Sequence, residues 1–392
     1  TDAFFKENIS TNEITMHFFL ENPEKYRLEQ PKNLYPSMNQ GSVLNEKIKI
    51  SKEIEKLKKF KQKELTKKQQ NTYMVLMDYL RRQKNLSMYP YYERILGKTS
   101  GQQAQILLTL SEYRLKNEKD IKSYFQLLKG LDGYFDSLIE YSKEQVKRNL
   151  FLSDQSLKEV LQQIQNVIKQ KENNMLVATF NLRIADIKGI NAAQKKKYCR
   201  ENKKLIGTKV LPAYEKLYSH LQALNGNGKN ENGLYYYKNG KEYYKVLVAQ
   251  KTGSDKTIEE MIEISDRSIE KCLRKLIKLQ KKYPNIINEY RNHKKNIKIV
   301  QNPQNILNKL RQKMVKYYPK APKVSCKIKY VHKTMEEYTS PAFYMVPEID
   351  SYKENVIYIN KAQTAELYPT LAHEGYPGHL YQNVYYAARN DD

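Results

Sequence analysis

The sequence lacks several features that common protein classes require. Its 392 residues contain no tryptophan, and the three cysteines, Cys199, Cys272 and Cys326, are too few and too far apart for a disulfide framework. No two cysteines have the CxxC spacing of a cysteine-ligated zinc site. No apolar run approaches the roughly 18 residues that a membrane-spanning helix needs. With 40% hydrophobic and 29% charged residues, the composition is that of a globular protein.

The net charge is strongly positive, at +26, and it comes mostly from lysine. Proteins that read a nucleic-acid sequence favour arginine, whose planar guanidinium pairs bidentately with phosphates and base edges. Here arginine is scarce, the lysines are spread along the whole chain, and no nucleic-acid-binding motif is present. We therefore expect a basic, solvated surface and no specific nucleic-acid partner. The alternative is a polyanion or an anionic surface as partner.

The chain is too long for one compact core, so we expect two regions. The first region, residues 1–225, has the apolar spacing of a helical bundle. Its first forty residues contain several prolines and predict an extended arm with one short helix. A helical pattern then runs over residues 45–96, in which Thr66 and Gln69 have the spacing of a capping box.

The rest of this region also predicts helices. Residues 102–149 predict two helices that separate near Gly130 and Gly133. Ser153 precedes the clearest one-sided apolar stripe, which consists of Leu157, Val160, Leu161, Ile164, Val167 and Ile168. A further helix is expected over residues 192–224, where Pro212 would bend or divide it.

The second region, residues 226–392, has a mixed pattern of strand and helix signals. Residues 233–249 surround Asn239-Gly240, the strongest two-residue hairpin signal, so we expect a β-hairpin there. Thr257 then opens a helix with the sequence of a capping box. Three strand-like runs follow, over residues 324–330, 342–346 and 355–360. The fold class expected for the whole chain is therefore mainly α with a small β-sheet.

The segment with distinctive chemistry follows the last of these strands, within a stretch from Thr364 onward that is compatible with a helix. It holds His373, Glu374 and His379. Zinc hydrolases need neutral imidazoles to hold the ion and a carboxylate that takes a proton from water. A small sheet followed by a helix with these residues is also the order in which zinc peptidases place a substrate-pairing strand beside the metal-binding helix. In this interpretation one of the strands at 342–346 and 355–360 pairs with the substrate backbone.

The spacing of the two histidines requires a break in this helix. On a straight helix, residues six apart point roughly 120° away from each other and cannot bind one ion. Pro377 and Gly378 supply helix-breaking residues between them. A loop at this step would bring His379 to the side of His373. The alternative is a surface His–Glu pair, with His379 bonded to a neighbouring backbone carbonyl.

Several segments resemble a known bacterial family. The run His373 to Gln382, His-Glu-Gly-Tyr-Pro-Gly-His-Leu-Tyr-Gln, is similar to the signature of the domain-of-unknown-function 885 family, which is grouped with zincin-like metallopeptidases. The segments 340–344 and 355–360, and the amino-terminal stretch 9–26, also resemble that family. The resemblance implies a zincin-like fold with a large helical amino-terminal part. It implies zinc as cofactor, His373 and His379 as its ligands and Glu374 as general base.

The family pattern has a third ligand that this sequence does not match. In the family a Glu lies on a following helix, in a segment resembling Glu-Gly-Trp-Ala-Thr-Tyr, whereas this chain has no tryptophan and reaches only to Asp392. We therefore expect residues 226–392 to end at the start of the active-site helix, in a fragment of a longer protein.

Two functions follow from these observations. The first is a zinc-dependent peptidase that hydrolyses peptides. The second is a non-catalytic surface or binding lipoprotein on a degenerate zincin scaffold, which the charge of +26 and the unmatched third ligand favour. The resemblance implies export, secreted or through a lipid anchor on a removed amino terminus. His17, His220, His293 and His332 have no ligand-like neighbours and are interpreted as structural or exposed.

Overall fold

The computed structural model describes residues 2–98, 100–285, 288–289, 292, 302–333, 336, 339–363 and 367–389. The described residues are mainly helical, with one small sheet, which agrees with the expected class. They group into two compact units that are not successive in the chain. Unit 1 contains Thr1–Asn45, Pro90–Glu231 and Pro303–Asp392, and unit 2 contains Glu46–Tyr89 and Asn232–Asn302. The grouping differs from the expected division after residue 225, because the chain enters unit 2 twice.

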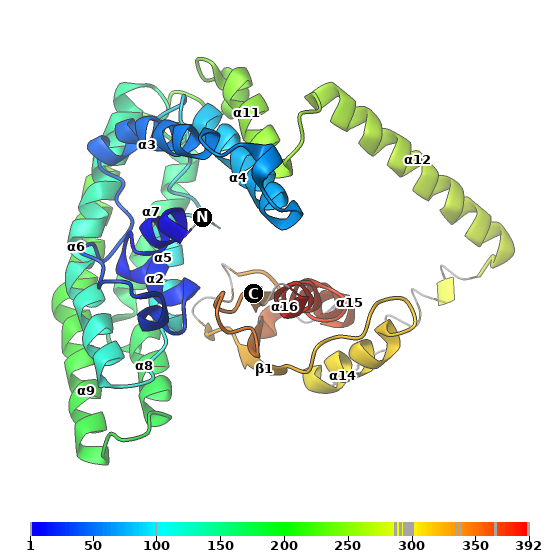
Figure 1. Ribbon diagram of the computed structural model, residues 1–392. Coiled ribbons are helices and arrows are strands. Elements are labelled where there is room, and N and C mark those ends of the chain that lie inside the picture. The colour runs from blue at the N-terminus through cyan, green and yellow to red at the C-terminus, as the bar shows by residue number, and fades with distance from the viewer. Residues whose placement is uncertain are drawn as a thin grey trace. The chain divides into compact units, whose positions relative to one another are not determined.

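The amino-terminal and central segments of unit 1 are helical. Short helices come first: α1 (Asp2–Ile9), α2 (Glu13–Phe19) and the 3-10 helix η1 (Pro23–Tyr26). The longer helices follow and pack beside one another (Figure 1): α5 (Gln102–Glu112), α6 (Glu118–Lys147), α7 (Asp154–Lys169), α8 (Met175–Ala185), α9 (Ala192–Leu205) and α10 (Leu211–Gln222). The expected extended arm is therefore wrong, because Asn12 caps α2 and the apolar Ile9, Met16 and Leu20 form a small buried cluster.

Helix α6 is the centre of this bundle. Asn117 and Asp120 close a capping box at its start, and its buried side, which includes Leu128 and Phe135, contacts α9 and α10. The break expected near Gly130 and Gly133 is not there. Both glycines lie inside α6, because burial of its apolar face outweighs their low helix propensity, and the break lies between α5 and α6 instead.

The break expected at Pro212 is present. Between α9 and α10 the chain forms one π-helical turn, Ile206–Val210, and Pro212 lies in the first turn of α10. Proline has no backbone N–H, so the helix cannot keep its regular hydrogen-bond ladder there. The expected helix behind Ser153 is also confirmed, with the Ser153 side chain accepting the backbone N–H of Ser156.

The carboxy-terminal part of unit 1 has its own core. It consists of α14 (Pro303–Met314), β1 (Ser325–Tyr330), β2 (Ala342–Met345), β3 (Glu354–Ile359), α15 (Leu367–Glu374) and α16 (His379–Arg389). All three expected strands are confirmed. In the sheet β3 lies centrally, parallel to β1 and antiparallel to β2. Leu307 of α14, Ile357 of β3, and Leu371 and Leu380 of α15 and α16 are almost fully buried together.

Unit 2 is built from α3 (Gln40–Lys58), which begins in unit 1, α4 (Lys67–Leu86), α11 (Gly240–Thr252) and α12 (Ile258–Lys282). The capping boxes expected at Thr66 and Thr257 are both present. The expected β-hairpin is wrong. Asn239, in the left-handed region at φ 55°, begins helix α11, which packs against α4 with Tyr243 buried. Burial against α4 thus outweighs the local hairpin preference of Asn-Gly.

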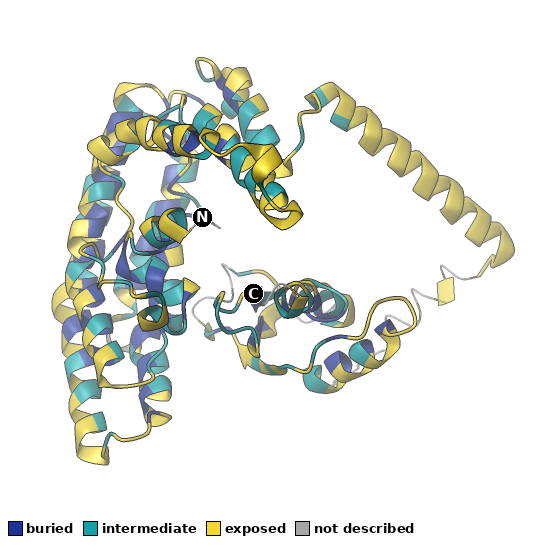
Figure 2. Ribbon diagram, viewed as in Figure 1, coloured by how far each residue is buried: buried dark blue, intermediate teal, exposed yellow. Residues whose placement is uncertain are grey.

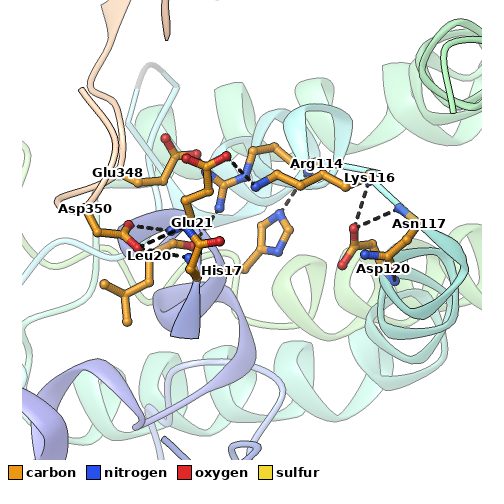
Figure 3. Close-up of polar contacts among 10 residues, drawn as sticks. His17, Leu20, Glu21, Arg114, Lys116, Asn117, Asp120, Glu348 and Asp350 are labelled. Carbon is orange, nitrogen blue, oxygen red and sulfur yellow. Dashed lines mark hydrogen bonds and ion pairs between the residues drawn. The ribbon is translucent and has the colours of Figure 1, made fainter. Parts of the chain in front are cut away.

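Within unit 1, the loop between β2 and β3 is tied to α2 and α5. Figure 3 shows its two acidic residues, Glu348 and Asp350, beside the residues that end these helices. Asp350 accepts the backbone N–H groups of Glu21 and Asn22, at 2.6 and 3.0 Å, and Glu348 pairs with Arg114. These bonds fix the far end of β2, so the small sheet is anchored on the helical bundle.

His17 lies in the same contact, where it is a structural histidine as expected. Its ring stacks on Tyr113, with centroids 3.6 Å apart. Its Nε2 accepts the backbone N–H of Arg114 at 2.9 Å (Figure 3). Burial lowers the pKa of His17 well below its usual value, and the nearby cations Arg114, Lys116 and Arg183 lower it further. His17 is therefore neutral in the folded protein at pH 7.

The neutral, buried state of His17 predicts acid sensitivity. In the unfolded chain this histidine takes up a proton below about pH 6.5, whereas in the folded chain it does not. The free energy of unfolding should therefore fall as the pH drops below 6.5, by up to about 1.4 kcal/mol per pH unit from this group. Urea unfolding of the wild type and His17→Gln between pH 5 and 7.5 measures it. The stability gap between them should narrow as the pH falls, and a constant gap would contradict the assignment.

Candidate metal centre

The expected break between the two histidines is present. Helix α15 ends at Glu374, helix α16 begins at His379, and Gly375-Tyr376-Pro377-Gly378 connects them. Residues 364–366 lie outside the described residues, so the helix expected from Thr364 onward is described from Leu367.

The connection depends on its two glycines. A Cβ on Gly378 would overlap the carbonyl oxygen of His373, so only glycine allows the chain to turn back this closely. A Cβ on Gly375 would also come too close to the Leu307 side chain, and Tyr376 beside it is buried. Backbone bonds from Tyr381 to the Gly375 carbonyl, 3.1 Å, and from Gln382 to the Gly378 carbonyl, 3.0 Å, then start the second helix. The loop is thus packed and hydrogen-bonded at both ends.

The loop brings the predicted ligands together. The ring centroids of His373 and His379 are 4.7 Å apart, and the rings are nearly perpendicular. One ring nitrogen from each histidine and one carboxylate oxygen of Glu374 lie within 4.8 Å of one another. Both histidines are exposed at the surface, while the Glu374 side chain is 13% exposed. All three residues of the predicted site therefore meet at one point.

Glu374 is held by the sheet. Its Oε2 accepts the backbone N–H of Tyr344 in β2 at 2.9 Å, and its Oε1 lies 4.0 Å from Nε2 of His373. The Tyr344 side chain is fixed in turn, because its hydroxyl donates to Oδ1 of Asn355 at 2.6 Å. One carboxylate oxygen is therefore anchored, and the other faces the histidines. The sequence contains no signal for this backbone contact, because it depends on how β2 packs against α15.

The donor set fits a zinc ion. Two imidazole nitrogens with a carboxylate nearby are the ligand types that zinc binds in hydrolases. Both rings are accessible, and in the described part of the chain no fourth His, Cys, Asp or Glu joins this cluster. At such an ion, the two histidines would be ligands and further coordination positions would stay open.

A groove runs from this cluster along β2. Its volume is about 620 Å³, with Ser340 to Tyr344 and Val346 on one side and His373, Glu374 and His379 on the other. Of the two candidate pairing strands, β3 has a neighbour on both sides, whereas β2 is at the edge of the sheet. The edge strand therefore lines the same groove as the predicted ligands, which selects β2 over β3 as the strand that can bind an extended chain.

The other described histidines, His17, His220 and His332, lie outside this cluster. His220 forms a 2.9 Å contact through Nδ1 with the Lys216 carbonyl oxygen inside α10. Partial burial lowers the pKa of His332, while Glu336 nearby raises it. His293 lies outside the described residues. The interpretation of His220 as a non-ligand residue agrees with these contacts.

Replacing Gly378 with alanine should disrupt the loop. The added Cβ would displace the His373 carbonyl or move the start of α16, so we expect a loss of about 2 kcal/mol or more in unfolding free energy, and separation of the two rings. Gly133→Ala is the matched control, since nothing lies within 4 Å of a Cβ there and the helix should gain up to about 1 kcal/mol. Chemical denaturation measures both. Equal stability of the two variants would contradict the packing argument.

The chain resembles known proteins in sequence and in fold. A family model described as "Bacterial protein of unknown function (DUF885)" matches residues 29–392. No curated protein matches the sequence. Among solved structures, "The crystal structure of the putative lipoprotein from Colwellia psychrerythraea" matches with a TM-score of 0.79 at 14% identity, over 100% of this chain and 71% of that chain. At this identity the likeness shows a shared fold.

No helix in the described part of the chain has both the length and the apolar character to cross a bilayer. The family match extends over nearly the whole sequence and includes every residue of the metal centre. The chain belongs to the DUF885 family of bacterial proteins.

Proposed function

We propose that this protein is a zinc-dependent peptidase that hydrolyses peptide bonds. The observation that carries the proposal is the meeting of His373, Glu374 and His379 within 4.8 Å, which requires a loop that only glycine permits. A surface His–Glu pair would need no such loop. The groove beside an edge strand gives the same site room for an extended peptide.

His373 and His379 would hold the ion through one ring nitrogen each. When bound, zinc supplies a Lewis acid that polarises a carbonyl and lowers the pKa of water. The histidines face solvent, and a zinc-binding site with open positions is the kind that serves catalysis.

Glu374 would transfer a proton from the attacking water to the departing amine. Its Oε2 is held by the Tyr344 N–H, so Oε1 is the oxygen free to accept a proton from the attacking water. The same oxygen can then deliver that proton to the departing amine. The hydrogen bond from β2 keeps the carboxylate aimed at the histidines, which reduces the reorganisation needed during the reaction.

Strand β2 would bind the substrate backbone by adding a strand to its open edge. Tyr344 in this strand already donates its N–H to Glu374. A peptide bound along the strand would therefore lie next to the proposed general base. An extended backbone in this groove would pass His373 and His379, which favours short or unfolded peptides over folded proteins.

We also propose that the protein acts outside the cytoplasm, secreted or through a lipid anchor. The match to a structure described as that of a lipoprotein supports this location. A zincin-like fold remains part of the same proposal.

The second candidate is a non-catalytic binding protein on the same scaffold. The cluster offers two histidines and one carboxylate among the described residues, and the net charge of +26 favours binding to an anionic surface. Such a protein would have no use for the aimed carboxylate of Glu374.

The peptidase proposal predicts separate effects for the ligands and the base. In the full-length protein, His373→Ala and His379→Ala should lose zinc, measured by metal analysis after dialysis, together with activity. Glu374→Gln should keep zinc and lose roughly 10²–10⁴-fold in kcat on a peptide library.

The matched control is Glu354→Gln, an acidic residue at the exposed start of β3, which should leave zinc content and kcat unchanged. If the wild type binds zinc but cleaves no more peptide than Glu374→Gln, the catalytic proposal is wrong and the binding protein is favoured. If the wild type binds no zinc, the metal centre itself is wrong.

A further inference from the structure

Helix α12 is exposed along its whole length after its first turn, from Ile262 to Lys282. None of its 25 residues is buried by any part of the chain that the structure describes (Figure 2). At about 1.5 Å per residue the helix is roughly 37 Å long. Its apolar side chains are large and about half exposed, among them Ile262, Ile269, Leu276 and Leu279. An isolated helix with such a face gains its stability from a partner that covers the face.

The apolar residues of α12 have the spacing of a coiled coil. Seven of them recur four or three residues apart on one stripe of the helix, with the small polar Ser265 at the eighth position: Ile258, Ile262, Ile269, Cys272, Leu276, Leu279 and, just after the helix, Tyr283. Met261, Ile264, Leu273 and Ile277 lie off this stripe. The order of intervals along the stripe is the same from either end. Two copies of the helix can therefore pair in opposite directions along this stripe. In that arrangement each stripe residue of one helix lies at the same level as a stripe residue of the other.

The charges of α12 are divided between its two halves. Residues 258–269 carry four acidic residues and one basic residue, whereas residues 270–282 carry six basic residues and one acidic residue. Arg267 and Arg274 pair with Glu263 and Glu270 within the helix. The remaining charges are acidic in the first half and lysine in the second half. An antiparallel copy would place each acidic half beside a basic half, whereas a parallel copy would place like charges together.

We propose that α12 is a self-association surface, which pairs two copies of this protein as an antiparallel coiled coil. In this pairing Ile262 lies opposite Leu279 of the second copy, and Ile269 lies opposite Cys272 of the second copy. The small Ser265 lies opposite the larger Leu276, which keeps that layer filled. The twofold axis crosses between residues 270 and 271, close to the middle of the helix. This surface belongs to unit 2, and the metal centre belongs to unit 1, so the proposal does not depend on the proposed function.

The molecular mass of the full chain in solution tests the association. Sedimentation over a range of protein concentrations should give twice the 46.4 kDa of one chain. Leu276→Glu should raise the dissociation constant of the dimer by at least about tenfold, because it places a carboxylate in an apolar layer. Ile277→Glu is the matched control, since Ile277 is 52% exposed, as Leu276 is at 50%, but lies off the stripe. Neither residue is buried, so both variants should fold, which circular dichroism checks.

Cysteine chemistry tests the direction of the pair. In an antiparallel dimer Ile269→Cys faces Cys272 of the second copy and should form a disulfide-linked dimer under mild oxidation. Lys271→Cys points away from the stripe and should not. Ile262→Cys in a Cys272→Ser background separates the two directions. A parallel pair would bring the two substituted positions together, whereas an antiparallel pair keeps them about 25 Å apart along the helix axis, so a disulfide-linked dimer of this variant would overturn the antiparallel arrangement.

Charge reversal gives an independent check. Reversing Glu259 and Asp266 to lysine should weaken the dimer, and reversing Lys275 and Lys282 to glutamate in the same chain should restore it. A wild-type protein that stays monomeric at every concentration would overturn the proposal, and would show that α12 is covered within its own chain.

Discussion

The close approach of Gly378 to the carbonyl oxygen of His373 is the constraint on which the metal centre depends. A continuous helix would point the two imidazoles roughly 120° apart, because they are six residues apart. The glycine lets the chain fold back over the end of α15 within four residues, and Pro377 prevents the first helix from continuing. The two rings then lie 4.7 Å apart on the ends of two different helices.

The positions of His373, Glu374 and His379 also depend on the residues that pack around the loop. Leu307 of α14 and Ile357 of β3 pack against Gly375, so the turn rests on the core of the carboxy-terminal part of unit 1. Strand β2 contributes the Tyr344 N–H that orients Glu374. The loop after β2 is anchored to the helical bundle through Asp350. Contacts from distant parts of the sequence thus position the Glu374 carboxylate.

Unit 2 differs from unit 1 because one of its long helices, α12, has no residue that the described part of the chain buries. Helices α4 and α11 bury part of their surface against each other, but α12 extends from them with its apolar stripe uncovered by the described residues. In a soluble monomer a stripe of this length costs free energy, because apolar surface stays in contact with water. The division of charge along α12 gives that stripe a preferred direction of pairing. The apolar stripe of α12 and the cluster of His373, Glu374 and His379 therefore belong to separate units.

The elements whose signals are local could be predicted from the sequence. The capping boxes at Thr66 and Thr257, the stripe behind Ser153, the three strands and the break at Pro377-Gly378 were all predicted, because each depends on residues a few positions apart. The sequence also indicated that His373, Glu374 and His379 lie together, which the cluster shows. Three features could not be predicted without the folded chain: the helix that begins at Asn239-Gly240, the position of Gly130 and Gly133 inside α6, and the hydrogen bond from β2 to Glu374. The physical reason is that burial against a distant helix or strand outweighs local backbone preferences of about 1 kcal/mol, and a single sequence does not say which distant surface a segment meets.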